Sequence, residues 1–293
     1  MTVEVRYLTD PACAWSWGAE PKLRRLMWEF GDGLRFRFVL GGLARSYGPE
    51  YRDSDGKIGT GSDPYADLMA HWLEVGAQTG MPVDPRIWKV APLSSTYPAC
   101  IAVKAAQDQG PEAAYKYLRR LREAIMLERR KADNLEALVA EAEPAGIDAQ
   151  RFRIDAQSND ALERFGYDLE EVRTIPDEAR AVAGAVAETE GRERLAFPAL
   201  VFVAEGGERH AVYGRADYDA WRAAAIAAGA EPVATGKPGV AEVVERFGRV
   251  ATREVEEITG LPAPVARAEL WALAREWRLR AVPVLGGELW EAA

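Results

Sequence analysis

Cysteine and histidine are scarce in this chain of 293 residues, which contains two of each. Cys13 and Cys100 are too few for a disulfide framework, and such sparse use of cysteine is typical of a reducing compartment. His71 and His210 lie far apart in the sequence, so no zinc-ligand spacing exists. We therefore expect no metal site.

Long apolar runs and an excess of positive charge are also missing. No apolar run reaches the roughly 18 residues of a membrane span, and the N-terminus has no secretory-signal pattern. The net charge of -9 argues against broad binding to phosphate backbones or anionic membranes. We expect a cytoplasmic protein that binds neither a membrane nor nucleic acid.

The segment that contains Cys13 carries the clearest chemical signal. A short strand is predicted over Val3 to Leu8 and a helix over Glu20 to Phe30, with the sequence DPACAWSWG between them at 10–18. In this arrangement Cys13 lies at a helix N-terminus, where unpaired amides and the helix dipole favour a thiolate. We expect Cys13 to be a nucleophile; the alternative is an inert core residue.

Ser16 occupies the position where a redox turn usually has its second cysteine. A hydroxyl stabilises a thiolate by a hydrogen bond but forms no disulfide, so the expected chemistry is capture of one sulfur and release by an outside thiol. Trp15 is a candidate rim for an unfolded or peptide substrate, or else a core anchor, as we expect for Trp17.

The rest of the pattern predicts an α/β fold interrupted by helices. A second strand is predicted over Leu34 to Leu40, and a polar, Gly-rich stretch at 45–64 is expected to be a mobile loop or a surface insertion. Helical patterns then cover Tyr65 to Gln78, Tyr97 to Gln109, Pro111 to Leu127, Leu135 to Ala142, Phe152 to Leu162 and Pro176 to Thr189. Ser94, Ser95 and Thr96 are expected to cap a helix, with Cys100 packed inside that helix or, alternatively, acting as a distant resolving thiol.

Strand character returns at Ala199 to Ala204 and continues, after a turn at 206–207, through Tyr213, followed by a helix over Tyr218 to Ala228. This order is typical of a thioredoxin-like fold with a large helical insertion. In that fold a proline before the central hairpin, here Pro198, usually has a cis bond and faces the redox cysteine. The alternative is a proline that merely begins an edge strand.

The C-terminal segment is predicted to be a small winged-helix-like domain. Helices are expected over Val240 to Phe247, Thr252 to Thr259 and Pro264 to Trp277, with Thr252 as an N-cap, followed by a two-stranded wing over 279–290. Residues 235–293 contain eight basic and nine acidic side chains, so we expect a packing or protein-interaction module rather than a DNA-binding one. The predicted domains are 1–63 with 193–234 (thioredoxin-like), 64–192 (helical insertion) and 235–293.

The motifs resemble those of the DsbA family, in its cytoplasmic branch of protein disulfide isomerases. The resemblance covers about residues 1–230 and rests on Asp10-Pro11, Cys13, Trp15, Trp17-Gly18, Val39 to Leu43, His71-Trp72, Thr79-Gly80 and Phe197 to Leu200, with Ser16 as the departure. It implies a thiol-disulfide oxidoreductase or isomerase acting on protein or low-molecular-weight thiols. Cys13 would be the nucleophile, Ser16 its hydrogen-bond donor and Pro198 the shaper of a groove in which Trp15, Phe197 and Ala199 contact the substrate.

A second resemblance is to the related adaptor that presents the regulator Spx to the ClpXP protease. It rests on Trp88, Pro92 to Ser95, Tyr97, Ala105-Ala106 and Gln109-Gly110, and implies a non-catalytic protein that binds a client. Kappa-class glutathione transferases and hydroxychromene carboxylate isomerases are more distant, and they imply a glutathione site over the same turn. Glutathione is therefore the only cofactor that the sequence suggests.

Overall fold

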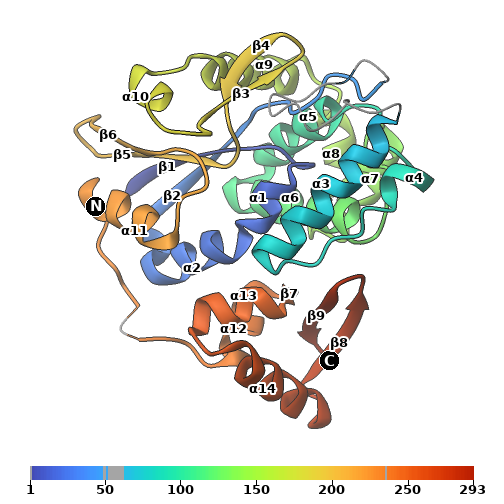
Figure 1. Cartoon of the computed structure of the whole chain (residues 1–293), viewed down its shortest axis with the longest axis vertical. Helices are drawn as coiled ribbons and strands as arrows, with labels where there is room; N and C mark the ends of the chain where they lie inside the picture. The colour runs from blue at the N-terminus through green and yellow to red at the C-terminus, as the bar shows by residue number, and fades with distance from the viewer. Residues whose placement is uncertain (1, 49–50, 52–62, 235) are drawn as a thin grey trace.

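The fold is built on a four-stranded sheet, seen in a computed structural model that describes residues 2–48, 51, 63–234 and 236–293. The strand order is β2-β1-β5-β6. β1 (Val3–Thr9) pairs in parallel with β2 (Leu34–Leu40) and antiparallel with β5 (Ala199–Val203), and β6 (Arg209–Val212) completes the sheet (Figure 1). This is the predicted thioredoxin-like sheet, with its strands within about one residue of the expected positions.

Helices cover both faces of this sheet, as Figure 1 shows. On one face lie α2 (Glu20–Phe30) and α11 (Tyr218–Ala227), where Tyr7 of β1 packs edge-on against Trp221. On the other lies α9 (Asn159–Arg173). Asp168 of α9 accepts a hydrogen bond from the Leu40 amide at 2.9 Å, which attaches the insertion to the outer strand β2.

The insertion is helical for most of its length, but two predicted helices are wrong. The one expected over Phe152 to Leu162 is broken, because Ser158 caps a new helix by accepting the Ala161 amide. The one expected over Pro176 to Thr189 is limited to a single turn and then becomes a hairpin. The helices are α3 (Pro64–Thr79), α4 (Ile87–Val90), α5 (Tyr97–Ala106), α6 (Pro111–Met126), α7 (Leu135–Ala140), α8 (Ala149–Asp155), α9 and α10 (Asp177–Arg180), with short 3-10 turns at Gly31–Gly33 and Gln107–Gln109.

The unexpected hairpin joins β3 (Val186–Thr189) to β4 (Arg192–Leu195). Its two connecting residues, Glu190 and Gly191, both have positive φ, at 53° and 75°. Two positive φ values in a two-residue turn match the twist of antiparallel strands, so the turn itself favours the hairpin. The alanine and glutamate residues of this stretch favour a helix, but the turn conformation outweighs that preference.

The C-terminal unit contains the three predicted helices and the predicted hairpin. Its elements are α12 (Val240–Phe247), β7 (Val250–Ala251), α13 (Thr252–Thr259), α14 (Ala263–Arg275), β8 (Leu279–Val284) and β9 (Gly287–Ala292), with strand order β7-β9-β8. The predicted N-cap at Thr252 is wrong by one residue. The helix begins at Thr252, and Glu254 accepts the amide of Ala251 at 2.7 Å.

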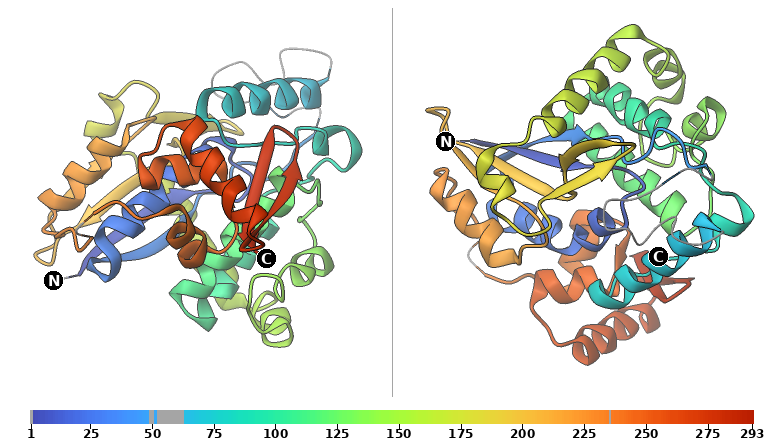
Figure 2. Two further views of the ribbon diagram at one scale, coloured as in Figure 1. Left: turned by 90° about the horizontal axis from the view of Figure 1, so that it is seen from below. Right: turned by 45° about the horizontal axis from the view of Figure 1, so that its top comes forward.

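The two further views in Figure 2 show this unit lying against the rest of the chain, where α13 packs on α2. Within the described ranges, no helix combines the length and the apolar character that crossing a membrane requires. The loop predicted at 45–64 falls largely on residues 49–50 and 52–62, which lie outside the described residues, as does Thr235 of the predicted linker.

Candidate functional site

Cys13 meets the loop before β5, as the sequence predicted. The turn after β1 closes with a hydrogen bond from the Cys13 amide to the Asp10 carbonyl at 3.2 Å, and α1 (Ala14–Gly18) follows with Cys13 as its N-cap. The Phe197-Pro198 bond is cis, which confirms that expectation. The thiol of Cys13 lies 4.0 Å from the carbonyl oxygen of Phe197.

The expected ionisation of Cys13 is wrong in direction. The residue is 5% exposed, and burial raises the pKa of its thiol, an effect that Asp10 increases and that Ser16 and Arg194 partly offset. The Ser16 amide donates to Sγ at 3.4 Å, but α1 has only five residues and therefore few aligned peptide dipoles. Cys13 is consequently a protonated, buried thiol at neutral pH.

The neighbours of Cys13 divide into core and cavity residues. Ser16 is fully buried, and its hydroxyl has no partner with complete hydrogen-bond geometry. Trp17 is the core anchor that we expected, since it is 0% exposed and its indole donates to the Pro82 carbonyl at 2.8 Å. Trp15 is half-buried and faces a cavity beside Cys13.

That cavity has a volume of about 120 Å³ and opens next to the thiol. Its walls come from α1, α3, the segment around Tyr47, the β3–β4 hairpin and Phe197, which confirms that distant segments meet at Cys13. Ala199 does not line it, because its side chain is 0% exposed inside the sheet. The predicted substrate contact by Ala199 stays a prediction, and Pro198 is likewise buried.

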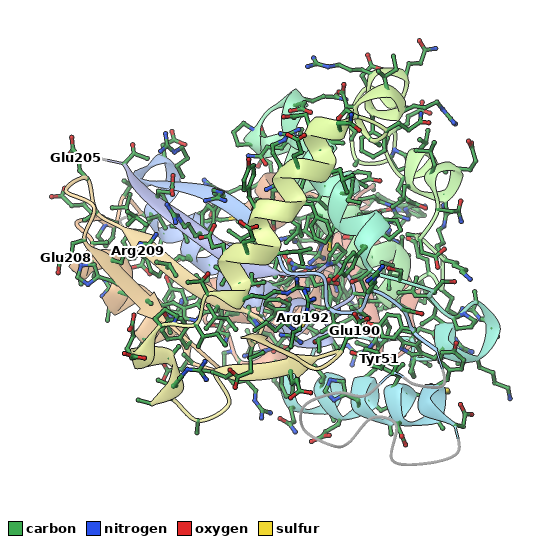
Figure 3. The ribbon with its side chains drawn as sticks, turned by 90° about the horizontal axis from the view of Figure 1, so that it is seen from above. Tyr51, Glu190, Arg192, Glu205, Glu208 and Arg209 are labelled. Carbon is green, nitrogen blue, oxygen red and sulfur yellow. The ribbon has the colours of Figure 1, made fainter. Side chains whose placement is uncertain are left out.

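The β3–β4 hairpin covers this cavity and is held at its tip. Glu190 accepts hydrogen bonds from the backbone amides of Arg45 at 2.8 Å and Ser46 at 3.1 Å. Figure 3 shows Glu190 and Arg192 at this tip, close to Tyr51. No sequence signal indicated the cover, because the hairpin was expected to be helical.

Asp10 is a buried hub that the sequence analysis did not single out, although the Asp10-Pro11 turn marked its position. Its carboxylate accepts from the Ala12 and Leu43 amides at 2.8 and 2.7 Å, from the Thr96 hydroxyl at 2.8 Å and from the Cys100 thiol at 3.3 Å. Burial raises the pKa of Asp10. The carboxylate thus joins the redox turn to β2 and to α5.

Two sequence predictions are resolved by this hub. Cys100 is 0% exposed and its thiol is directed to Asp10, so it is the packed cysteine of the first alternative. Of the expected caps, Ser95 accepts the Tyr97 amide at 3.1 Å, whereas Thr96 uses its hydroxyl on Asp10.

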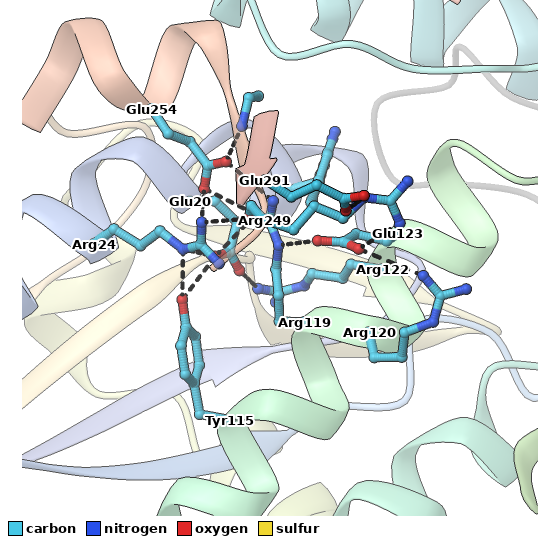
Figure 4. Close-up of polar contacts among 12 residues, drawn as sticks. Glu20, Arg24, Tyr115, Arg119, Arg120, Arg122, Glu123, Arg249, Glu254 and Glu291 are labelled. Carbon is cyan, nitrogen blue, oxygen red and sulfur yellow. Dashed lines mark hydrogen bonds and ion pairs between the residues drawn. The ribbon is translucent and has the colours of Figure 1, made fainter. Parts of the chain in front are cut away.

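A second cluster of charges joins the thioredoxin-like unit to the C-terminal unit (Figure 4). Glu254 of α13 receives two hydrogen bonds from Arg119 of α6, at 2.9 and 3.0 Å, and an ion pair from Arg24 of α2 at 3.1 Å. Glu20 of α2 pairs with Arg122 of α6. All five side chains are at most 6% exposed.

The cluster continues toward the surface through half-buried groups. Arg249, between α12 and α13, pairs with Glu128 at 3.0 Å and with Glu123 at 3.3 Å. Burial raises the pKa of Glu128, but Arg120 and Arg249 outweigh that effect and bring it to about 2. Arg249 therefore extends the contacts of the C-terminal unit to α6 and to the segment that follows α6.

Comparison with known proteins relates the chain to redox folds and to adaptors. The thioredoxin family model matches residues 7–175. The ClpXP adapter protein SpxH of Halalkalibacterium halodurans is 31% identical over 173 residues, covering 59% of this chain and 55% of that protein. The SpxH protein of Shouchella clausii is 26% identical over 294 residues, covering 99% of this chain and 88% of that protein.

Solved structures share the fold. The cytosolic disulfide reductase DsbM of Pseudomonas aeruginosa superposes with a TM-score of 0.52 at 20% identity, covering 75% of this chain and 95% of DsbM. A protein disulfide isomerase candidate from Nitrosomonas europaea gives a TM-score of 0.59 at 23% identity, covering 78% and 97%. The chain therefore belongs to the thioredoxin family, shares its fold with DsbM and is related in sequence to the SpxH adapter proteins.

Proposed function

We propose that this protein is an adaptor that binds a client protein and presents it to a ClpXP-type protease. The observation that carries the proposal is the extent of the match to the Shouchella clausii adapter, which covers 99% of this chain and therefore includes the C-terminal unit. The relatives' name describes adapters, and a client-binding role needs a stable surface rather than a redox pair.

The site geometry supports binding more than dithiol catalysis. Cys13 is buried with a raised pKa, and Ser16 cannot release a mixed disulfide. The C-terminal unit is attached through buried ion pairs of Glu254, so the insertion and this unit form one continuous framework for a client. We also propose a cytoplasmic location, and we do not propose that the protein binds nucleic acid.

A second candidate function is monothiol exchange at Cys13. It is favoured by one specific observation, the approach of the thiol to the carbonyl before cis-Pro198 beside a cavity. There Cys13 would capture one sulfur of a disulfide, and an outside thiol would release it.

A degradation assay with purified ClpXP and an Spx-type client separates the two functions. We expect the wild-type chain and Cys13→Ala to accelerate client loss equally, because an adaptor needs the surface and not the sulfur. Acceleration that disappears in Cys13→Ala would favour thiol chemistry. No acceleration by either protein, with an active SpxH adapter as the positive control, would reject the adaptor proposal.

A further inference from the structure

We propose that the cavity beside Cys13 is a site for a small carboxylate-bearing thiol and its disulfide. This inference rests on the second candidate function, monothiol exchange, and names its substrate class. It is carried by the size of the cavity and by two lining side chains, an arginine and a tyrosine, that have no acidic partner and no hydroxyl partner, respectively, in the described part of the chain.

Arg194 brings a buried positive charge to this cavity. Its side chain donates to the Thr189 hydroxyl and the Leu195 carbonyl, both at 2.9 Å, and lies over the Phe197 ring at 4.4 Å. These partners are neutral, and within the described part of the chain no carboxylate pairs with Arg194. A cation that is 8% exposed is costly without an anion, which a ligand carboxylate would supply.

The second charged side chain in the described lining is also positive, while the Asp10 carboxylate lies behind the Cys13 turn and is already held by four hydrogen bonds. Arg215 lines its mouth with its guanidinium 4.4 Å from the centre of the Trp15 ring, and no ion pair of Arg215 occurs among the described residues. No aspartate or glutamate belongs to the described lining. In a chain with a net charge of -9, this local excess of positive charge selects for an anion.

Tyr47 supplies an unused hydrogen-bonding group. It lines the cavity, is 5% exposed, and its hydroxyl has no hydrogen-bond partner among the described residues. Cys13, Arg194 and Tyr47 all line the same cavity. Buried hydroxyls are normally paired, and a carboxylate oxygen would accept this one.

The volume limits the size of the ligand. At about 120 Å³ the cavity is somewhat smaller than a cavity of roughly 150 Å³ that holds one benzene molecule. A mercaptocarboxylate of a few carbons fits this space, whereas a tripeptide thiol would leave most of its atoms outside. The site therefore differs from the glutathione site that the distant resemblances implied.

The exchange is balanced without a further oxidant. Cys13 Sγ attacks one sulfur of the disulfide, the S–S bond of the ligand breaks, and a mixed disulfide with Cys13 forms. The second sulfur leaves as a thiolate and takes up the proton that Cys13 loses. Because Ser16 has no sulfur, a second small thiol must attack the mixed disulfide to restore Cys13.

Two disulfides of similar length and opposite charge test the selection. The full chain is treated with dithiodiglycolate, which carries two carboxylates, or with cystamine, which carries two amines, and adduct formation is followed by intact mass. Each rate is divided by that of a small free thiol, which removes the intrinsic difference between the reagents. We expect a preference of about tenfold for dithiodiglycolate, the effect of one charge-assisted hydrogen bond.

Variants assign this preference to its residues. Arg194→Gln should lower it to within about twofold, and Tyr47→Phe should slow the reaction with dithiodiglycolate more than that with cystamine. Arg192→Gln, an exposed change on the same hairpin, should leave both rates unchanged. Unchanged circular dichroism checks that each variant is folded.

The outcomes separate the inference from the function on which it rests. Equal normalised rates for both reagents would reject anion selection but would not reject monothiol exchange. A preference for dithiodiglycolate that persists in Arg194→Gln would have the same two consequences. If neither reagent labels the native protein while both label Cys13 in denaturant, both proposals are rejected.

Discussion

Arg119 and Glu254, separated by 135 residues, form a buried two-bond ion pair at 2.9 and 3.0 Å. Arg119 belongs to the insertion and Glu254 to the C-terminal unit, so the pair crosses the boundary that the sequence predicted at 235. Both charges are removed from water and belong to a network of buried pairs, since Arg119 also pairs with Glu123 at 2.8 Å and Glu254 with Arg24 at 3.1 Å. This pair makes the position of the C-terminal unit sensitive to single substitutions.

Glu254→Gln should destabilise the whole chain by about 2–3 kcal/mol, the cost of losing hydrogen bonds to a buried charged group, because Arg119 retains its pair with Glu123. The measurement is the free energy of unfolding in urea. Glu276→Gln is the matched control, since Glu276 is exposed and its ion pair with Arg278 is long, at 3.8 Å. This variant should change the free energy of unfolding by less than about 0.5 kcal/mol. Equal effects of the two changes would contradict the structural role of the Glu254 pair.

Acid should loosen the same junction through Glu128. Its pKa is about 2 in the folded chain, below the value near 4.3 of an unfolded glutamate. Glu128 therefore adds stability above about pH 4.3, and this contribution is lost as the pH falls toward 2. Between pH 6 and pH 3, unfolding free energy should fall more in the wild type than in Glu128→Gln.

Glu163→Gln serves as the control for this acid effect. Glu163 is exposed and pairs with no described residue, so its variant should follow the wild-type pH dependence. A wild type and Glu128→Gln with the same pH dependence would show that Arg120 and Arg249 do not hold a charged Glu128.

The tip of the β3–β4 hairpin controls access to Cys13. Glu190→Ala removes the acceptor of the Arg45 and Ser46 amides, so the cover should open more often and alkylation of Cys13 by iodoacetamide should accelerate about fivefold. The rate should keep rising above the pH near 8.5 at which a free thiol ionises, because burial raises the pKa of Cys13.

The control for this experiment is Glu188→Ala, an exposed change on the same hairpin that removes no described hydrogen bond. It should leave the alkylation rate unchanged. If Glu190→Ala also leaves the rate unchanged, the Glu190 contacts do not limit access to the thiol.

Local sequence patterns were sufficient to predict the sheet. They were also sufficient to predict that the Cys13 turn meets the loop before β5. The apolar alternation of Val3 to Leu8 and the run at Ala199 to Ala204 are short-range signals, and the cis bond before Pro198 follows from the fold that their order defines. The prediction that Cys13 meets the loop before β5 needs no more than this order.

Long-range packing explains what the sequence did not indicate. Val186 to Leu195 contains helix-forming alanine, glutamate and arginine, yet the positive φ values at 190–191 and the contacts of Glu190 stabilise a hairpin. Arg119 and Glu123 have the spacing of a solvated helix face, and only α13, more than a hundred residues later, buries them. The raised pKa of Cys13 also results from long-range packing, because the β3–β4 hairpin and the loop before β5, which help to bury the thiol, are distant in sequence.

Returning a sulfur to the turn tests whether its geometry still permits dithiol chemistry. The Ser16 amide lies 3.4 Å from Cys13 Sγ and the Ser16 side chain is fully buried, so in Ser16→Cys the two sulfurs are neighbours at the start of α1. We expect this variant to form an internal disulfide on oxidation, seen as loss of both thiols to alkylation, and to gain insulin reductase activity in a turbidity assay.

Ser16→Ala is the control and should gain neither property, because it adds no sulfur. A Ser16→Cys variant that forms the disulfide but reduces no insulin would place the block in the cover, and combining it with Glu190→Ala should then restore activity. If the disulfide itself does not form, α1 has departed from redox-turn geometry. In that case the buried thiol serves packing alone, and the adaptor function would not involve sulfur chemistry at this turn.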